Sequence, residues 1–385
     1  MKNSKLWLIT LVLALGLAMV LTGCGGGTSS ESSDSDQGEG NDAGQEAQNL
    51  SQEEVIAEID RITDEVNAGN LTLEEGIEEL KAVIPKPEGY PERKIEYVIA
   101  WGEGGGSDLY ARHIIEDAQK ILGVDIIPNN MPGGNGEVGL AYVLSQPADG
   151  YTLYGAVATQ VVNEALEEQP HSFTEDTDFI IRNQGATEVY WVKADSPFKT
   201  FDDVIAAEKE NPGSVTMIGG GIEDEIRLAE LNSQLGTEIV NIPSQGSGER
   251  VASLLGGHVD ILHETTGAVI DLYKDGQIRP ILLPNEAFRE AFPDEEVQTV
   301  EDIGVDITVS RWRGINAPKG LDPEIKQYLH NVFYAASKLP FYKNYHEENF
   351  FHLTEGYLNS EDYEDSAKEE VKVIREILEE TGYVE

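Results

Sequence analysis

Four glycines stand among the five residues Gly102–Gly106, directly after the apolar run Tyr97–Trp101. Such a cluster favours a tight turn or a close approach of the backbone to a bound group. Ser107 or Asp108 can cap the helix predicted after the turn. The first N–H groups of a helix have no partner within it and lie at the positive end of its dipole. A strand, a glycine turn and a helix in this order can bind an anion.

Two nucleotide-binding motifs are incomplete at this turn. A P-loop requires a lysine after its glycines, but Ser107 follows Gly106 directly. The dinucleotide fingerprint G-x-G-x-x-G would begin at Gly102 and would place Ser107 at its last glycine. Two interpretations therefore stay open, a carboxylate held by backbone donors and a glycine-rich turn without a ligand.

Motifs for catalysis are also incomplete. His263-Glu264 begins the zinc motif H-E-x-x-H, but Gly267 stands where the second histidine belongs. The hydrolase motif G-x-S-x-G is missing, and the 7 histidines show no paired metal spacing. We therefore expect no enzyme, no cofactor and no metal site. A hydrolase whose residues come together only in space is the alternative.

The charge of the chain restricts its partners. Among 385 residues, 71 are acidic and 27 basic, which gives a net charge of −44. A chain of this charge cannot neutralise phosphates, so nucleic acid is excluded as a partner, and adsorption to anionic lipid is disfavoured. Because the overall field repels anions, a carboxylate site must depend on donors at short range. We expect backbone N–H groups, rather than charged side chains, to be those donors.

Residues 1–23 resemble a secretory leader of the lipoprotein type. Lys2 and Lys5 precede the apolar run Leu6–Leu21, and the leader ends before Cys24 in the sequence L-T-G-C. This ending resembles the bacterial lipobox, in which the cysteine carries the lipid. A membrane-spanning helix is the alternative, but the apolar run is shorter than the ~20 residues that such a helix needs. Cys24 is the only cysteine, so a disulfide is excluded and an acyl anchor explains it best.

Two segments separate this leader from the main body. Residues 24–49 are rich in Gly, Ser, Asp, Glu and Gln and carry almost nothing apolar, which predicts a flexible acidic linker. Residues 50–90 contain two apolar stripes at helical spacing, separated by Asn67–Asn70, and predict a helical hairpin. It could be a spacer or a docking element. Pro85, Pro87 and Pro91 mark its end.

The main body alternates predicted strands and helices, which favours an α/β fold with a mostly parallel sheet. A glycine-rich turn leads into a helix four times along it, and three of these turns follow an apolar strand directly. In open α/β sheets such turns lie at the carboxyl ends of the strands, where ligands bind. These turns are Gly102–Ser107, Gly133–Gly136, Gly219–Gly221 and Gly246–Gly248.

The main body resembles the substrate-binding proteins of tripartite tricarboxylate transporters over roughly residues 93–380. The weaker sequence G-I-N-A-P-K-G-L at 314–321 fits the same family. The four main motifs occur in the family's order and spacing. They are I-A-W-G-E-G-G-G-S-D (99–108), N-N-M-P-G-G-N-G-E-V-G (129–139), A-D-G-Y-T-L (148–153) and I-P-S-Q-G-S-G-E-R-V-A-S-L-L-G-G-H-V-D (242–260).

This resemblance implies a two-lobed periplasmic-binding-protein fold, type II-like, whose cleft closes over a small carboxylate. The first lobe would comprise residues 91–192 and 311–385, and the second residues 193–310. The resemblance also implies a pair of integral membrane subunits driven by an ion gradient. The protein would then be extracytoplasmic, anchored by lipid at the outer face of the membrane or in the periplasm, and we expect a monomer. A receptor of the same fold that signals to a membrane sensor is the alternative function.

The ligand-binding residues are expected in four turns matched to the family, together with Trp101 as a wall and Thr159 and Thr265 after strands. A departure from the family is the run Glu223-Asp224-Glu225, which would oppose a polycarboxylate or form an amine- or cation-binding corner. These carboxylates could instead only favour the helix N-terminus electrostatically. The residues from the turns are Glu103, Gly104, Gly105, Gly106, Ser107, Gly133, Gly134, Asn135, Gly221, Ile222, Glu223, Ser244, Gln245, Gly246 and Ser247.

Overall fold

The computed structural model describes residues 50–166, 169–244, 246–307 and 311–380. The expected leader, Cys24 and the acidic linker, as well as Gln245 in the second-lobe turn, lie outside the described residues. No helix within the described ranges is long and apolar enough to span a membrane.

The first sheet has six strands in the order β12-β4-β11-β3-β1-β2. Strand β1 is parallel to both neighbours, while β11 runs antiparallel to β3 and β4. The sheet is therefore mixed rather than mostly parallel, because the chain returns to it through β11 after building the second sheet. Its strands are β1 (Ile95–Ile99), β2 (Ile126–Asn130), β3 (Thr152–Val157), β4 (Thr177–Ala186), β11 (Arg311–Pro318) and β12 (Tyr357–Leu358).

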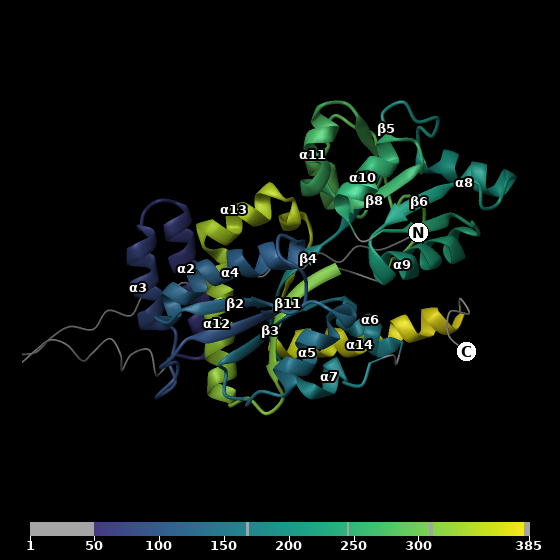
Figure 1. Cartoon of the computed structure of the whole chain (residues 1–385). Coiled ribbons are helices and arrows are strands. Elements are labelled where there is room, and N and C mark those ends of the chain that lie inside the picture. The colour runs from purple at the N-terminus through teal and green to yellow at the C-terminus, as the bar shows by residue number, and fades with distance from the viewer. Residues whose placement is uncertain (1–49, 167–168, 245, 308–310, 381–385) are drawn as a thin grey trace, which may run out of the picture. The chain divides into compact units, whose positions relative to one another are not determined.

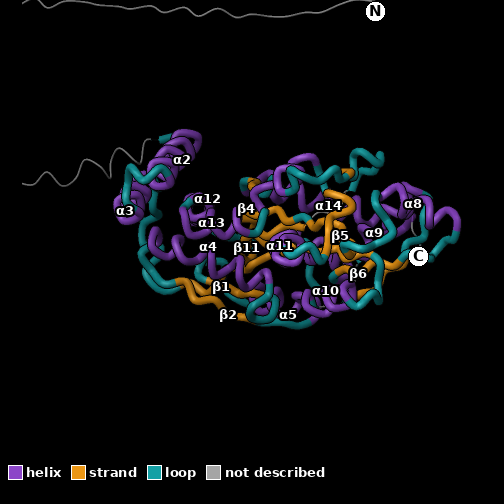
Figure 2. Tube along the Cα trace, turned by 90° about the horizontal axis from the view of Figure 1, so that it is seen from above, coloured by secondary structure: helices purple, strands orange, loops and turns teal. Residues whose placement is uncertain are grey.

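Helices cover both faces of the first sheet (Figures 1 and 2). Side chains along β1 alternate between the faces, so Tyr97 and Ile99 join one buried cluster while Val98 joins another. The strands are apolar on both sides for this reason. The helices are α4 (Gly106–Leu122), α5 (Glu137–Leu144), α6 (Thr159–Ala165), α7 (Phe173–Asp176), α12 (Pro323–Lys338), α13 (Pro340–Glu348) and α14 (Ser360–Glu380), with 3-10 turns η2 (Gly134–Gly136) and η4 (Phe351–Leu353).

The second sheet also has six strands, in the order β10-β9-β5-β8-β6-β7. It is mixed, since β5 is antiparallel to β8 and β9 while β6 is parallel to β7 and β8. The elements are β5 (Glu188–Lys193), α8 (Phe201–Glu210), β6 (Thr216–Gly219), α9 (Gly221–Leu235), β7 (Val240–Pro243), α10 (Ser247–Leu255), β8 (Ile261–Thr265), α11 (Thr266–Lys274), β9 (Ile278–Leu283), η3 (Glu286–Ala291) and β10 (Gln298–Thr299).

The chain passes between the two sheets near Thr187 and again before Arg311. Strand β5 belongs to the second sheet, so the first crossing precedes the boundary expected after residue 192. The sequence hides this crossing because β4 and β5 are both extended and only Thr187 lies between them. Strand β11, which begins at Arg311, belongs to the first sheet again.

The helical hairpin consists of α2 (Gln52–Asn67) and α3 (Leu73–Val83), and each helix begins with a complete capping box. Its apolar stripe, with Ile59 and Leu80 fully buried, joins the same cluster as residues of α4 and α12. A hydrogen bond of 2.9 Å from the Tyr334 hydroxyl to Asp60 adds to this contact. The hairpin is thus packed onto the first lobe, and Figure 1 shows it beside α4 and α12.

Candidate functional site

A cavity of about 630 Å³ is lined by segments that belong to both sheets. Its walls include the turn after β1, the turn after β3, the first residues of α9 and the first residues of β11. Its lining residues are Trp101, Gly102, Glu103, Gly105, Gly106, Ser107, Asn135, Val157, Ala158, Thr159, Gly220, Gly221, Ile222, Glu223, Glu225, Arg250, Arg311, Trp312 and Arg313.

The expected ligand-binding residues divide into two groups. The expected residues after β1, after β3 and at the start of α9 line this cavity, with the exception of Gly104. Asn135 lines it as well. The remaining expected residues within the described ranges are not among its lining residues. These are Gly104, Gly133, Gly134, Ser244, Gly246, Ser247 and Thr265.

The N-terminus of α4 offers free backbone donors to the cavity. Helix α4 begins at Gly106 after Gly105, which has no capping side chain. Asp108, predicted as a possible cap, instead accepts a 2.9 Å hydrogen bond from the Gly104 N–H within the turn. The N–H groups of Gly106 and Ser107 have no hydrogen-bond partner among the described residues. They can therefore donate to a bound anion.

The guanidinium of Arg313 lies against this turn. A Cβ added to Gly106 would approach Arg313 Nη2 to 2.6 Å, so the glycine makes room for the arginine. Arg313 donates to Gln184, and its Nε is buried without a partner. In the described ranges no carboxylate forms an ion pair with Arg313. A cationic group and free N–H donors thus meet at one place on the cavity wall.

The second-lobe turn around Gly246 is occupied by a carboxylate of the chain itself. Glu264 accepts hydrogen bonds from the Ser247 hydroxyl at 2.7 Å and from the Thr265 N–H at 3.0 Å. Arg250 Nη2 lies 2.5 Å from Oε2 of Glu264, the same oxygen that accepts from Ser247. Ser244 likewise donates to Glu249, at 2.7 Å. The described hydroxyl groups of this turn therefore already donate to carboxylates of the protein itself.

A buried ion-pair network lies where the chain crosses between the sheets. Arg311 pairs with Glu188 at 2.6 Å and with Asp224 at 3.3 Å. Arg227 also pairs with Asp224, at 2.6 Å, and His263 Nδ1 lies 3.0 Å from the same carboxylate. Burial alone would raise the pKa of Asp224, but the charges of Arg311 and His263 hold it well below its usual value.

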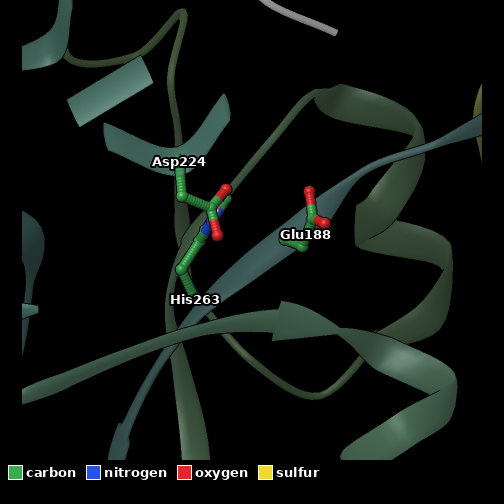
Figure 3. A group of neighbouring side chains, drawn as sticks. All are labelled: Glu188, Asp224 and His263. Atoms are coloured by element: carbon green, nitrogen blue, oxygen red, sulfur yellow. Dashed lines mark hydrogen bonds and ion pairs between the residues drawn. The ribbon is translucent and has the colours of Figure 1, made fainter. Parts of the chain in front are cut away.

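Glu188, Asp224 and His263 are close enough to suggest a metal site. Figure 3 shows the imidazole of His263 beside the Asp224 carboxylate, with the Glu188 carboxylate to one side. Both carboxylates, however, are already bound by guanidinium groups, from Arg311 and Arg227. A divalent cation here would face these two fixed positive charges. We therefore interpret the cluster as an ion-pair network that fixes the crossing.

The acidic residues that line the cavity, unlike those of the ion-pair network, lack positively charged ion-pair partners in the described part of the chain. Glu223 is 9% exposed and accepts a hydrogen bond from Thr159, which lies on α6 beside the first sheet. Within the described residues, neither Glu223 nor its neighbour Glu225 forms an ion pair, and the same is true of Glu103. The cavity wall therefore presents unpaired groups of both signs.

The arginines that line this cavity were not among the residues predicted from the sequence. Arg311 and Arg313 are two residues apart on one strand and so share a face, which the R-W-R pattern at 311–313 could have revealed. Arg250 lies inside a motif quoted above, but nothing local marks it as facing the cavity. Trp312 also reaches the cavity lining, and its Nε1 donates to Glu370 at 2.7 Å.

His346 lies near Arg313 and gives the fold a dependence on pH. Burial lowers the pKa of His346 to about 4, and the charges of His352 and Arg313 act in the same direction. The unfolded chain therefore takes up a proton at this histidine near pH 6.5, whereas the folded protein takes it up only near pH 4. The contribution of His346 to the free energy of unfolding is full above pH 6.5 and is lost as the pH falls toward 4.

We expect His346→Gln to reduce this loss. Relative to the variant, the original protein should lose roughly 2–3 kcal/mol of unfolding free energy between pH 7 and pH 4.5, measured by urea denaturation. His258→Gln, at an exposed position, is the control and should leave the pH dependence unchanged. Equal acid sensitivity in the original protein and His346→Gln would refute the assignment.

Comparison with known proteins identifies the relatives of this fold. A family model described as the tripartite tricarboxylate transporter family receptor matches residues 110–383. The chain belongs to this receptor family. The resemblance noted in the sequence is therefore confirmed. A relative from Cupriavidus necator, described as the UPF0065 protein in gbd 5'region, is 34% identical over 297 residues, which cover 76% of this chain and 89% of the relative. The protein BugT of Bordetella pertussis is 28% identical over 242 residues, 61% of this chain and 74% of that protein.

Solved structures confirm the two-lobed periplasmic-binding-protein fold of this receptor. A TctC solute-binding protein from Polaromonas, without ligand, has a TM-score of 0.64 at 23% identity, covering 76% of this chain and 99% of that chain. MatC from Rhodopseudomonas palustris with bound malate has a TM-score of 0.62 at 20% identity, covering 75% and 100%. Another R. palustris protein, with adipate, has a TM-score of 0.64 at 20% identity, covering 76% and 98%.

Proposed function

We propose that this receptor captures a small organic acid in the cavity between its two sheets and delivers it to a membrane transporter. Arg313 carries the proposal, because it is a guanidinium without a carboxylate partner in the described part of a chain of net charge −44. It lies against the free N–H groups of α4. A carboxylate placed there would accept hydrogen bonds from both.

The relatives support the same ligand class. MatC has bound malate, and the second R. palustris protein has adipate. For this chain we infer a carboxylate held by Arg313 and the α4 N-terminus, with the lobes closing around it by hinge motion near Thr187 and Arg311. The proposed site thus combines a charged side chain, Arg313, with the backbone donors expected from the sequence.

The cellular setting is part of the proposal. We infer that Cys24 carries an acyl anchor, that residues 24–49 tether the receptor at the outer face of the membrane or in the periplasm, and that two integral subunits driven by an ion gradient accept the ligand. The family to which the chain belongs supports the transporter as partner. A sensing receptor with the same cavity is the second candidate, and co-purification with membrane subunits would distinguish the two.

A thermal-shift screen of the purified receptor against mono-, di- and tricarboxylates tests carboxylate capture. A true ligand at about 100 times its Kd should add about 2.7 kcal/mol to the free energy of unfolding. Amines and sugars without a carboxylate serve as controls and should produce no shift. Stabilisation by plain amines, with none by any carboxylate, would contradict the proposed function.

A further inference from the structure

We propose that the ligand carries an amine as well as a carboxylate, and that Glu223 with Thr159 receives the ammonium group. This inference rests on the proposed function, since it assigns the carboxylate of the ligand to Arg313. It goes further by naming the substrate class, amino-substituted carboxylates, and the residues that select it.

The charges around the cavity lead to this class. Arg250 and Arg311 line the cavity but are already paired, with Glu264 and with Glu188 and Asp224 respectively. Among the lining charges that the structure describes, Arg313 forms no ion pair with an acid, and Glu103, Glu223 and Glu225 form none with a base. Of these three acids only Glu223 is buried, and the charge of Arg311 acts on it without forming an ion pair. A ligand with one negative and one positive group would pair with Arg313 and with Glu223. A dicarboxylate would bring its second charge into a cavity with a buried carboxylate.

The environment of Glu223 favours an ammonium group. Its carboxylate is 9% exposed and holds one neutral hydrogen bond, from Thr159. Burying a carboxylate this deeply costs free energy unless a cation or several donors compensate it. An ammonium group has three donors. It can therefore bond to Glu223 and to the Thr159 hydroxyl oxygen, which is still free to accept.

The position of Glu223 at a helix N-terminus does not account for this arrangement. A negative charge in the first turn of α9 is favoured by the helix dipole, but Asp224 supplies one there as well. The dipole requires neither that Glu223 line the cavity nor that Thr159 of the neighbouring α6 donate to it. Because Thr159 follows a first-sheet strand and Glu223 a second-sheet strand, the pair also joins the two walls of the cavity.

Calorimetry with matched ligands tests the inference. We would titrate the receptor with carboxylic acids and with their amino derivatives of the same carbon skeleton, for example butyrate against 2- and 4-aminobutyrate, and succinate against aspartate. The best amino derivative should bind at least about tenfold more tightly than its parent acid. Glu223→Gln keeps an acceptor for Thr159 but removes the charge, and should weaken the amino derivative roughly ten- to a hundredfold while leaving the parent acid unchanged or tighter.

Glu210→Gln is the matched control, because Glu210 is exposed at the end of α8 and the substitution makes the same charge change. It should alter neither affinity, and unfolding curves of both variants verify that they fold. Equal affinity for acids and amino derivatives, unaffected by Glu223→Gln, would overturn the inference and leave carboxylate capture standing. Loss of binding to both ligand types in Glu223→Gln would also overturn it. Binding of amines without a carboxylate would instead remove the proposed function.

Discussion

Arg313→Gln should abolish high-affinity carboxylate binding while the receptor remains folded. Removing one partner of a buried, hydrogen-bonded charge pair costs about 2–5 kcal/mol of binding free energy. Arg313 pairs with no acid among the described residues, so its loss leaves no carboxylate of the protein uncompensated. Its loss does leave the buried amide oxygen of Gln184 without the donor that Arg313 supplies, so the free energy of unfolding should fall by about 1–3 kcal/mol. Calorimetry and urea denaturation measure the two quantities.

The matched variant is Arg313→Lys, which keeps the charge but loses the two-pronged hydrogen-bonding geometry of the guanidinium. It should bind the same acid with intermediate affinity. Arg93→Gln changes an exposed arginine that is not among the residues lining the cavity, and should bind as the original protein does. If Arg313→Gln retained full affinity, the carboxylate would have to bind elsewhere in the cavity.

Arg311→Met should destabilise the fold strongly. Glu188 and Asp224 are 3% and 1% exposed, and Arg311 pairs with both. Removing it leaves buried negative charge without its main partner, which typically costs 3–5 kcal/mol of unfolding free energy at neutral pH. Because the folded-state pKa of Asp224 lies below its unfolded value near 3.9, the network stabilises above that pH and weakens as the pH falls below it.

A double variant distinguishes charge from packing in this network. Adding Glu188→Gln to Arg311→Met removes one of the stranded charges and should restore part of the lost stability, measured as coupling in a double-mutant cycle. Arg61→Met, which breaks an exposed pair with Glu79, is the control and should cost no more than about 1 kcal/mol. A cost of that size for Arg311→Met would contradict the structural role assigned to the network.

Local patterns in the sequence were sufficient to predict the elements around the cavity. The strand ending before Trp101 and the glycine turn before α4 follow from an apolar run and from glycine's conformational freedom. Gly104, for example, adopts φ +74°, where a side chain would be strained. The α/β class follows equally from the alternation of apolar runs and amphipathic helices. These signals extend over a few residues, so one sequence reveals them.

The composition of the cavity depends on contacts that no short pattern contains. Arg313 reaches Gly106 from a strand more than two hundred residues later in the chain. Glu264 reaches Ser247 from the next strand, and this internal carboxylate takes up a hydroxyl donor of a turn that looked available, together with the N–H of Thr265. The crossing near Thr187 was hidden because the two strands that it separates follow each other with a single residue between them. The R-W-R alternation was the one local signal that could have drawn attention to the arginines.

A crystal structure of the receptor bound to the best acid from the screen would show where the ligand carboxylate binds. We expect this carboxylate to accept hydrogen bonds of about 2.7–3.2 Å from the Arg313 guanidinium and from the N–H groups of Gly106 or Ser107. A carboxylate bound outside this corner, with Arg313 still directed only at Gln184, would contradict this expectation.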